Sequence, residues 1–363
     1  MLRELEIKNF RSVVETKLPL EPLSVLIGPN NAGKTNLLRA IQVLSHATIN
    51  LRSDGAKSKA FTTSFPYPFH TRNRQAGEQA PSELVATTDS GKLTCRLAQQ
   101  AGQLGGSVTV QGPAGEAIRA DDPLFQKILG ELRSSDIYSF EPSAARRPVS
   151  MQMVREIRRE RPASQRRSFA ADGTGLAGVL FALQSDWPER WDTLIEEFRV
   201  FVPGIKRINF GENEGNVSLT YWEEGQRSAT PIEDVSDGIV LLTALLALRF
   251  SVDNPAIVLL EDPERGVHPR RLHEVTSTLI ELSEGSEGVL PIQTIMTSHS
   301  PYFLDRFRDA PKSIVLVERP DQRGTQCVPL PQRLNDLPEL KNANLGELWY
   351  SGVLGGVPRE VDA

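Results

Sequence analysis

Apolar positions near the two ends of the chain follow the patterns of buried strands and of helices. Residues 23–27 and 256–260 are short runs in which nearly every position is apolar, and residues 292–296 form a third such segment. These runs predict strands that are buried on both faces. Residues 36–41 have apolar side chains at helical spacing, and residues 239–250 are a strongly apolar helical segment. The pattern predicts an α/β fold with a mixed or parallel sheet flanked by helices.

The middle of the chain has a different pattern. Residues 49–86 are crowded with Ser, Thr, Pro and charged residues, which predicts a long surface excursion. The elements expected after it are a hairpin (93–97 with 107–110), two helices (176–183 and 191–202) and a second pair of strands (205–210 with 217–221). We therefore expect three segments: a first part of the core at 1–48, an inserted β-rich and helical lobe at 49–230, and a second part of the core at 231–363.

Composition and charge argue against a membrane span, a cysteine-based site and a surface that is basic all over. No run approaches the ~20 uncharged apolar residues of a membrane span, so we expect a cytoplasmic protein. Cys95 and Cys327 lie far apart, which argues against a disulfide framework or a cysteine metal site. Because the net charge is −5, any contact with DNA requires a local basic patch. The region Arg155–Arg167 holds six arginines against two glutamates, and is either such a patch or a solvated helix face.

A phosphate-binding motif follows the first apolar strand. Residues 28–35 read Gly-Pro-Asn-Asn-Ala-Gly-Lys-Thr and match the pattern G-x-x-x-x-G-K-[ST] between a predicted strand and a predicted helix. In such a loop, backbone N–H groups and the helix N-terminus hold phosphates. Lys34 can reach the β- and γ-phosphates, and the Thr35 hydroxyl can bind Mg²⁺. The sequence thus predicts a nucleoside triphosphate with Mg²⁺, and the absence of an Asn-Lys-x-Asp guanine motif favours ATP.

Polar residues follow two of the later apolar strands. Glu261-Asp262-Pro263-Glu264 comes directly after residues 256–260, and His299 follows the strand predicted at 292–296. Parallel strands bring such residues to the carboxyl edge of a sheet, where acids beside a phosphate loop hold Mg²⁺ or polarise water. Lys34 and Glu261 are 227 positions apart, which indicates a large insertion between the two motifs.

Five short motifs follow one another in a recognisable order. They are Ile7–Ser12, Gly28–Asn36, Val235–Gly238, Glu261–Glu264 with Gly266–Pro269, and Thr297–Pro301. Taken in this order, they resemble the motifs of the stand-alone AAA/ABC-type ATPases of the RecF, SMC and overcoming-lysogenization-defect (OLD) groups. The resemblance covers both ends of the chain and little of residues 50–150. It implies a P-loop NTPase of the ABC-ATPase head type, with a β-hairpin and helical insertion between the phosphate loop and the signature motif.

Carried over position by position, the resemblance implies where ATP binds. Arg11 would lie near the nucleotide. Ser236 and Gly238 match the signature turn, which in the resembling proteins contacts the γ-phosphate held by a second subunit, so ATP would join two chains as a homodimer. The residues of the Walker A loop that would bind ATP are Gly28, Asn30, Asn31, Ala32, Gly33, Lys34, Thr35 and Asn36.

The resemblance also implies catalytic roles. Glu261 would be the Walker B acid and hold Mg²⁺ together with Thr35. Asp262 would take the place of the glutamate that usually polarises water, so the family order Asp-Glu is reversed here. Because aspartate is one methylene shorter, hydrolysis is expected to be slow or shared with Glu264. His299 matches the switch histidine that senses the γ-phosphate.

Several functions agree with these motifs. The first is a dimerising ATPase that couples its nucleotide state to DNA or to a partner protein in DNA repair or in defence against mobile elements. The second is the ATPase of an OLD-type nuclease system whose nuclease is a separate effector protein, because only 45 residues follow Glu318 and no Asp-x-Asp pair occurs among them. A third is a nucleotide-gated scaffold with little turnover. A transport ATPase is disfavoured by the Asn-Phe-Arg-Ser segment and by the long interruption.

Overall fold

The computed structural model describes residues 1–53, 60–63, 81–100, 103–158, 169–251, 255–286, 289–320, 324–337 and 343–354. Two compact units divide the chain. The first contains Met1–Ile137, Pro255–Leu260 and Gln293–Ala363, and the second contains Tyr138–Asn254 and Glu261–Ile292. None of the helices within the described ranges is both long and apolar enough to span a membrane.

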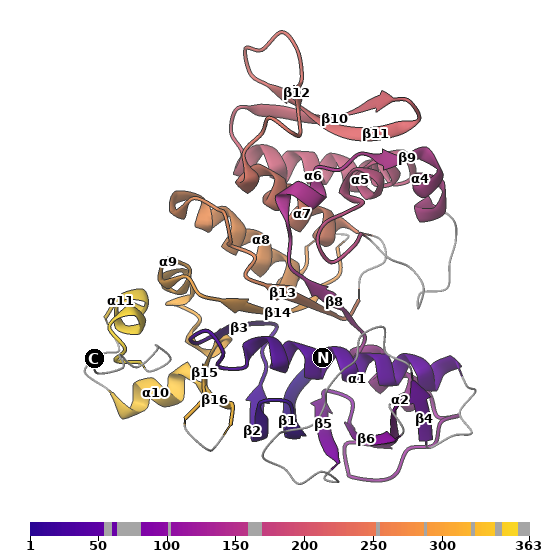
Figure 1. Ribbon diagram of the computed structural model, residues 1–363, viewed down its shortest axis with the longest axis vertical. Coiled ribbons are helices and arrows are strands. Elements are labelled where there is room, and N and C mark those ends of the chain that lie inside the picture. Colours follow the sequence, from indigo (N-terminus) through magenta and orange to yellow (C-terminus); the bar gives the residue numbers. More distant parts are fainter. Residues whose placement is uncertain are drawn as a thin grey trace. The chain divides into compact units, whose positions relative to one another are not determined.

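An antiparallel sheet forms one layer of the first unit (Figure 1). Its strand order is β2-β1-β5-β6-β7-β4. Burial alternates along β5, as expected for a sheet with one face on the core. The hairpin expected at 93–97 and 107–110 is confirmed by β6 and β7. The strands are β1 (Leu2–Phe10), β2 (Val13–Pro19), β4 (Ala60–Thr63), β5 (Ser82–Thr88), β6 (Lys92–Gln100) and β7 (Gln103–Gln111).

A second sheet of the first unit contains the predicted apolar strands. Its order is β16-β15-β3-β14-β13-β8, and β3 pairs in parallel with both β14 and β15. Every residue of β3 and of β14 is buried, as the nearly continuous apolar runs predict. The strands are β3 (Leu23–Ile27), β8 (Ser134–Tyr138), β13 (Ile257–Glu261), β14 (Gln293–Ser298), β15 (Ile314–Glu318) and β16 (Gln326–Pro329).

Helix α1 (Lys34–Ser53) connects the two sheets through one hydrophobic core. It contacts β1 of the antiparallel sheet and β14 of the other (Figure 1). Its buried residues Leu37 and Ile41 belong to the same cluster as Leu5 of β1 and Ile295 of β14. The remaining helices of this unit are α2 (Pro123–Glu131), α9 (Pro301–Leu304), η3 (Asp305–Phe307), η4 (Pro311–Ser313), α10 (Leu330–Asp336) and α11 (Leu345–Tyr350).

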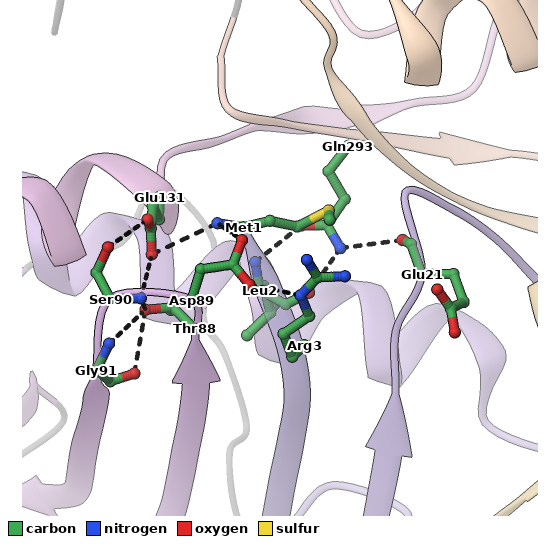
Figure 2. Close-up of polar contacts among 10 residues, drawn as sticks. All are labelled: Met1, Leu2, Arg3, Glu21, Thr88, Asp89, Ser90, Gly91, Glu131 and Gln293. Carbon is green, nitrogen blue, oxygen red and sulfur yellow. Dashed lines mark hydrogen bonds and ion pairs between the residues drawn. The ribbon is translucent and has the colours of Figure 1, made fainter. Parts of the chain in front are cut away.

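A buried glutamine also joins the two sheets. Gln293, the first residue of β14, is 5% exposed. Its Oε1 accepts from the backbone N–H of Leu2 at 3.0 Å, and its Nε2 donates to the carbonyls of Leu2 at 2.7 Å and Glu21 at 3.1 Å (Figure 2). The amide therefore satisfies buried backbone groups at the start of β1 and just before β3. This fixes the start of β14 relative to β1 and β3.

The second unit is built of helices and a small sheet. Strand order in the sheet is β10-β11-β12, with β9 also pairing with β11. Helix α7 is buried from Val240 to Phe250, so it forms the core of the unit. The elements are α3 (Pro142–Ala145), β9 (Val149–Ser150), α4 (Met151–Arg158), α5 (Leu176–Asp186), α6 (Pro188–Phe201), β10 (Ile205–Asn213), β11 (Asn216–Glu223), β12 (Thr230–Pro231), α7 (Asp237–Phe250), η2 (Pro269–Arg271) and α8 (Leu272–Glu284).

The two units divide the chain at places other than those expected from the sequence. Strands β5 to β7 fall in the expected inserted lobe at 49–230, but β5 pairs with β1 and extends the N-terminal sheet. The physical reason is that β5 pairs with backbone groups on the edge of β1 that β2 leaves unpaired. Part of the excursion expected at 49–86 lies outside the described residues.

An ion triad around a buried arginine joins three helices of the second unit. The guanidinium of Arg249, in the last turn of α7, is 2% exposed and pairs with Glu197 of α6 and Glu281 of α8. It also donates to Ser286 Oγ at 3.1 Å. One guanidinium pairs with two carboxylates, so the ionised triad carries a net negative charge. Burial, reinforced by the neighbouring Glu281 carboxylate and only partly offset by Arg249, raises the pKa of Glu197 to about 7.

This raised pKa predicts a pH-dependent stability. The ordinary pKa of glutamate is 4.5, so the folded state holds a proton on Glu197 that the unfolded state releases. The contribution of this proton to the free energy of unfolding is therefore complete below about pH 4.5, and it is lost as the pH rises to about 7. Urea titrations at several pH values should show that Glu197→Gln flattens this part of the profile. An unchanged slope in the variant would contradict the assignment.

Candidate functional site

The predicted phosphate loop connects β3 to α1 in the first unit. Two of its residues have left-handed backbone conformations, Asn31 with φ 67° and Gly33 with φ 108°. Asparagine tolerates this region better than most residues, and glycine adopts it freely. The N–H groups of Asn36 and Leu37 then donate to the Gly33 carbonyl at 2.9 and 3.1 Å, which begins the helix. Local sequence rules therefore account for the turn from strand to helix.

Neighbouring segments leave no space for side chains at the two motif glycines. A Cβ on Gly28 would lie 2.1 Å from the Val317 carbonyl oxygen of β15. A Cβ on Gly33 would lie 2.1 Å from Thr325 Oγ1 and 2.7 Å from Ser12 Oγ. Close packing therefore requires glycine at both positions. At Gly33 the left-handed backbone angle also favours glycine.

Lys34 has a fixed position within the loop. It is 5% exposed, and its Nζ donates to the carbonyls of Gly28 at 2.8 Å and Pro29 at 3.0 Å. A buried ammonium needs such acceptors, because desolvation without hydrogen bonds is costly. The loop thus holds a positive charge beside the N-terminus of α1, where a phosphate would also be favoured. Thr35 lies next to it in the first turn and is half-buried.

Arg11 adds a second cation to the start of α1. It lies between β1 and β2 with φ 52°, and its Nη1 donates to Asn36 Oδ1 at 3.4 Å. Burial, with a smaller contribution from the charge of Arg39, lowers the pKa of Arg11 to about 10. The guanidinium remains protonated at neutral pH, so its half-buried charge favours an anion at this place.

Strand register brings the histidine motif to the level of the loop. In the parallel pair of β14 with β3, Ser298 is opposite Ile27, so His299 and Gly28 are the next residues of adjacent strands. Both motifs belong to the first unit. Strand β13 neighbours β14, and the Gln293 N–H donates to the Ala256 carbonyl at 3.1 Å, so the two strands start together and run in parallel. Glu261 is the last residue of β13.

The acidic turn after Glu261 belongs to the second unit and has its own geometry. Asp262 has φ 46° and is half-buried, and its carbonyl accepts from the Arg265 N–H at 2.9 Å. Glu264 is 7% exposed. His268 Nδ1 accepts from the Arg270 N–H at 3.2 Å and thereby caps η2. The two candidate bases therefore differ in access, since Asp262 is reachable by water and Glu264 is largely covered.

The signature turn begins α7 in the second unit. Ser236 is the N-cap residue and is exposed, and no heavy atom lies within 4 Å of a Cβ built on Gly238. Arg146, at the end of α3, fixes the turn: it donates to the Val235 carbonyl at 2.8 Å and pairs with Asp237 at 2.7 Å. Sequence reasoning missed Arg146 because it lies about ninety positions before the turn and carries no motif.

The basic region Arg155–Arg167 is described only in part. Arg155 and Arg158 lie on α4 and are exposed, and Arg158 pairs with Asp186 at 2.5 Å. The rest of this region, from residue 159, lies outside the described residues. Within the described ranges, no group of three or more His, Cys, Asp or Glu residues is arranged to hold a metal ion.

Two sequence profiles match the chain. The profile described as "AAA ATPase domain" matches residues 1–77, and the one described as "AAA domain, putative AbiEii toxin, Type IV TA system" matches residues 127–305. The first contains the phosphate loop. The second contains the signature turn, the acidic turn and His299.

Sequence similarity to a curated protein covers a short segment of the chain, whereas the similarity in fold to a solved structure covers most of it. An OLD nuclease of Thermus scotoductus is 52% identical over 54 residues, which is 15% of this chain and 10% of that protein. A crystal structure of an SMC head bound to the C-winged helix domain of ScpA aligns over 90% of this chain and 97% of that chain. Its TM-score is 0.55 at 14% identity, so it confirms the predicted fold and nothing more.

Proposed function

We propose that this chain, which belongs to the AAA/ABC-type ATPases of the OLD- and SMC-like group, binds ATP with Mg²⁺ and hydrolyses it. The observation that carries the proposal is the phosphate loop. Its ammonium is held by two loop carbonyls, and its second glycine has a left-handed backbone with no space for a side chain. Loops of this kind bind nucleotide phosphates through backbone N–H groups.

The residues proposed to hold Mg²⁺ have suitable chemistry. Thr35 and Glu261 offer a hydroxyl and a carboxylate, and oxygen donors are the ligands that Mg²⁺ prefers. When bound, the ion would neutralise charge on the phosphates. Lys34 and Arg11 would add fixed positive charge beside them. His299 would act as the γ-phosphate sensor, which is supported by its register with Gly28.

We assign the role of orienting and activating the attacking water to Asp262. Its half-buried side chain is accessible, whereas Glu264 is 7% exposed and therefore better suited to supporting the turn. In the attack, the water oxygen bonds to the γ-phosphorus, the bond to the β–γ bridging oxygen breaks, and a carboxylate accepts the water proton. Glu264 is the alternative base.

The signature turn supports a homodimer as the active form. Ser236 is exposed at the N-terminus of a 14-residue helix, and Arg146 fixes the backbone before it. Such a helix start can bind a phosphate offered by a second subunit. The exposed Arg155 then belongs to a surface that could contact DNA, or a partner protein, in repair or defence.

A second candidate function is the ATPase of an OLD-type nuclease system. The observation that favours it is the identity to an OLD nuclease, although the matched segment spans only 10% of that protein. In that case the nuclease would be a separate effector. A nucleotide-gated scaffold with little turnover is the third outcome that the experiment below distinguishes.

Steady-state phosphate release, with and without duplex DNA, tests the proposal when combined with light scattering. We expect Asp262→Asn to lower kcat by about 10²-fold or more and to trap ATP-bound dimers. Glu264→Gln should retain most of the activity. Glu284→Gln, an exposed acid at the end of α8, is the matched control and should be unchanged.

Three results would change these assignments. A loss confined to Glu264→Gln would transfer the role of base to that residue. ATP binding without turnover by the unmodified protein would favour the scaffold. Failure of the unmodified protein to bind ATP would overturn the proposed function.

A further inference from the structure

Two side chains from distant segments contact the phosphate loop from outside it. Thr325 follows the isolated bridge between Gly324 and Val13, and its N–H donates to the Ser12 carbonyl at 2.9 Å. Thr325 is fully buried, and its Oγ1 donates to the Ala32 carbonyl of the loop at 2.7 Å. Its Oγ1 also lies 2.7 Å from Ser12 Oγ. The C-terminal part of the first unit thus contacts the nucleotide loop directly.

The direction of these hydrogen bonds follows from counting protons. A carbonyl can only accept, so the single hydroxyl proton of Thr325 is used on Ala32. Ser12 must then donate to Thr325, and the Ser12 oxygen is free to accept from Asn36 Nδ2, which lies at 2.8 Å. The bonds form one chain that runs from Asn36 through Ser12 and Thr325 to Ala32. Chains aligned in this way strengthen each bond in turn.

The two ends of this chain of bonds flank the last three residues of the motif. Ala32 precedes Gly33-Lys34-Thr35 and Asn36 follows it, so the two hydroxyls bridge the segment that would contact the β- and γ-phosphates. The hydroxyls also lie where a side chain at Gly33 would be. The loop sequence allows this backbone conformation, and the hydrogen bonds from the two hydroxyls hold the loop in it.

We infer that Thr325, with Ser12, is a positioning residue that fixes the phosphate loop in its nucleotide-binding conformation. The inference rests on the proposed function, since it concerns the same site. Neither residue belongs to the phosphate-loop motif. Because the loop N–H groups must converge on one anion, loosening the Ala32 carbonyl should lower affinity for the nucleotide more than it lowers the stability of the fold.

The test compares two variants that differ only in the hydroxyl. Thr325→Ser and Thr325→Ala both lose the methyl group, but only the serine variant can still donate to Ala32. Binding of the non-hydrolysable analogue AMPPNP with Mg²⁺, measured by calorimetry, should be weakened about tenfold in Thr325→Ala and by less than about twofold in Thr325→Ser. Ser12→Ala should change binding in the same direction but less, because the bond from Thr325 to Ala32 is kept.

A single variant, Thr48→Ala, controls for the loss of a buried hydroxyl. Thr48 is 1% exposed in α1, and its Oγ1 donates to the Ser45 carbonyl at 2.7 Å, away from the loop. Thr48→Ala should lower the Tm about as much as Thr325→Ala and leave AMPPNP affinity unchanged. Equal affinities of Thr325→Ala and Thr325→Ser would overturn the inference. If the unmodified protein bound no AMPPNP, the proposed function itself would fail, which is a different result.

Discussion

Replacement of Lys34 by methionine should abolish nearly all ATP turnover and leave the fold intact. Methionine keeps an unbranched apolar stem of similar length and removes the charge. The Gly28 and Pro29 carbonyls lose their donor, a cost of about 1–3 kcal/mol for buried groups, but the cost of burying an ammonium is also removed. The two terms oppose each other, so the change in the free energy of unfolding should be small.

The effect on catalysis has no such compensation. Lys34 would be the cation closest to the charge that develops on the transferred phosphoryl group, and loss of one such donor lowers kcat about 10²- to 10³-fold. Phosphate release and calorimetric binding of AMPPNP measure the effect, with thermal unfolding to verify the fold. Lys17→Met is the control, because Lys17 lies on β2 of the same unit and is exposed. Turnover within tenfold of the unmodified protein would contradict a nucleotide role for the loop.

The parts of the structure that follow local rules could be predicted from the sequence. The phosphate loop lies between a five-residue buried strand and a helix with apolar residues at helical spacing, and it contains two residues that tolerate a left-handed backbone. Each of these is determined within a few positions of the chain. The same holds for β13 and β14, whose apolar runs indicated buried strands. The order of these strands in the sheet could not be read from the runs themselves.

Contacts between distant segments could not be predicted. Thr325 contacts Ser12 across 313 positions, and a single buried hydroxyl leaves no periodic signal in the sequence. Arg146 is separated from Val235 by 89 positions, and an arginine after a short helix resembles any solvated side chain. The pairing of β5 with β1 was missed for a related reason, because alternating strands indicate a sheet but do not indicate which edge they join.

Arg249→Leu should have the largest effect on the stability of the second unit. Leucine fills part of the same volume but leaves Glu197 and Glu281 without their shared guanidinium. Removing one partner of a fully buried ion pair costs about 3–5 kcal/mol. Because the Glu197 and Glu281 side chains are 22% and 42% exposed, solvent should reduce the cost here to about 1–3 kcal/mol. Urea denaturation at pH 7 should show this loss. Arg158→Leu removes an exposed pair with Asp186 and should cost less than about 1 kcal/mol.

Two further results separate lost charge pairing from lost packing. The penalty of Arg249→Leu should shrink as the pH falls from 7 to 5, because a protonated Glu197 no longer needs the guanidinium as its counter-charge. Adding Glu197→Leu and Glu281→Leu should restore most of the stability, since an apolar triad needs no counter-charge. A penalty that stays constant with pH would instead identify packing as the cause. Because α7 runs from Asp237, next to the N-cap residue Ser236, to Phe250, the variant should also weaken the proposed ATP-dependent dimerisation through the signature turn.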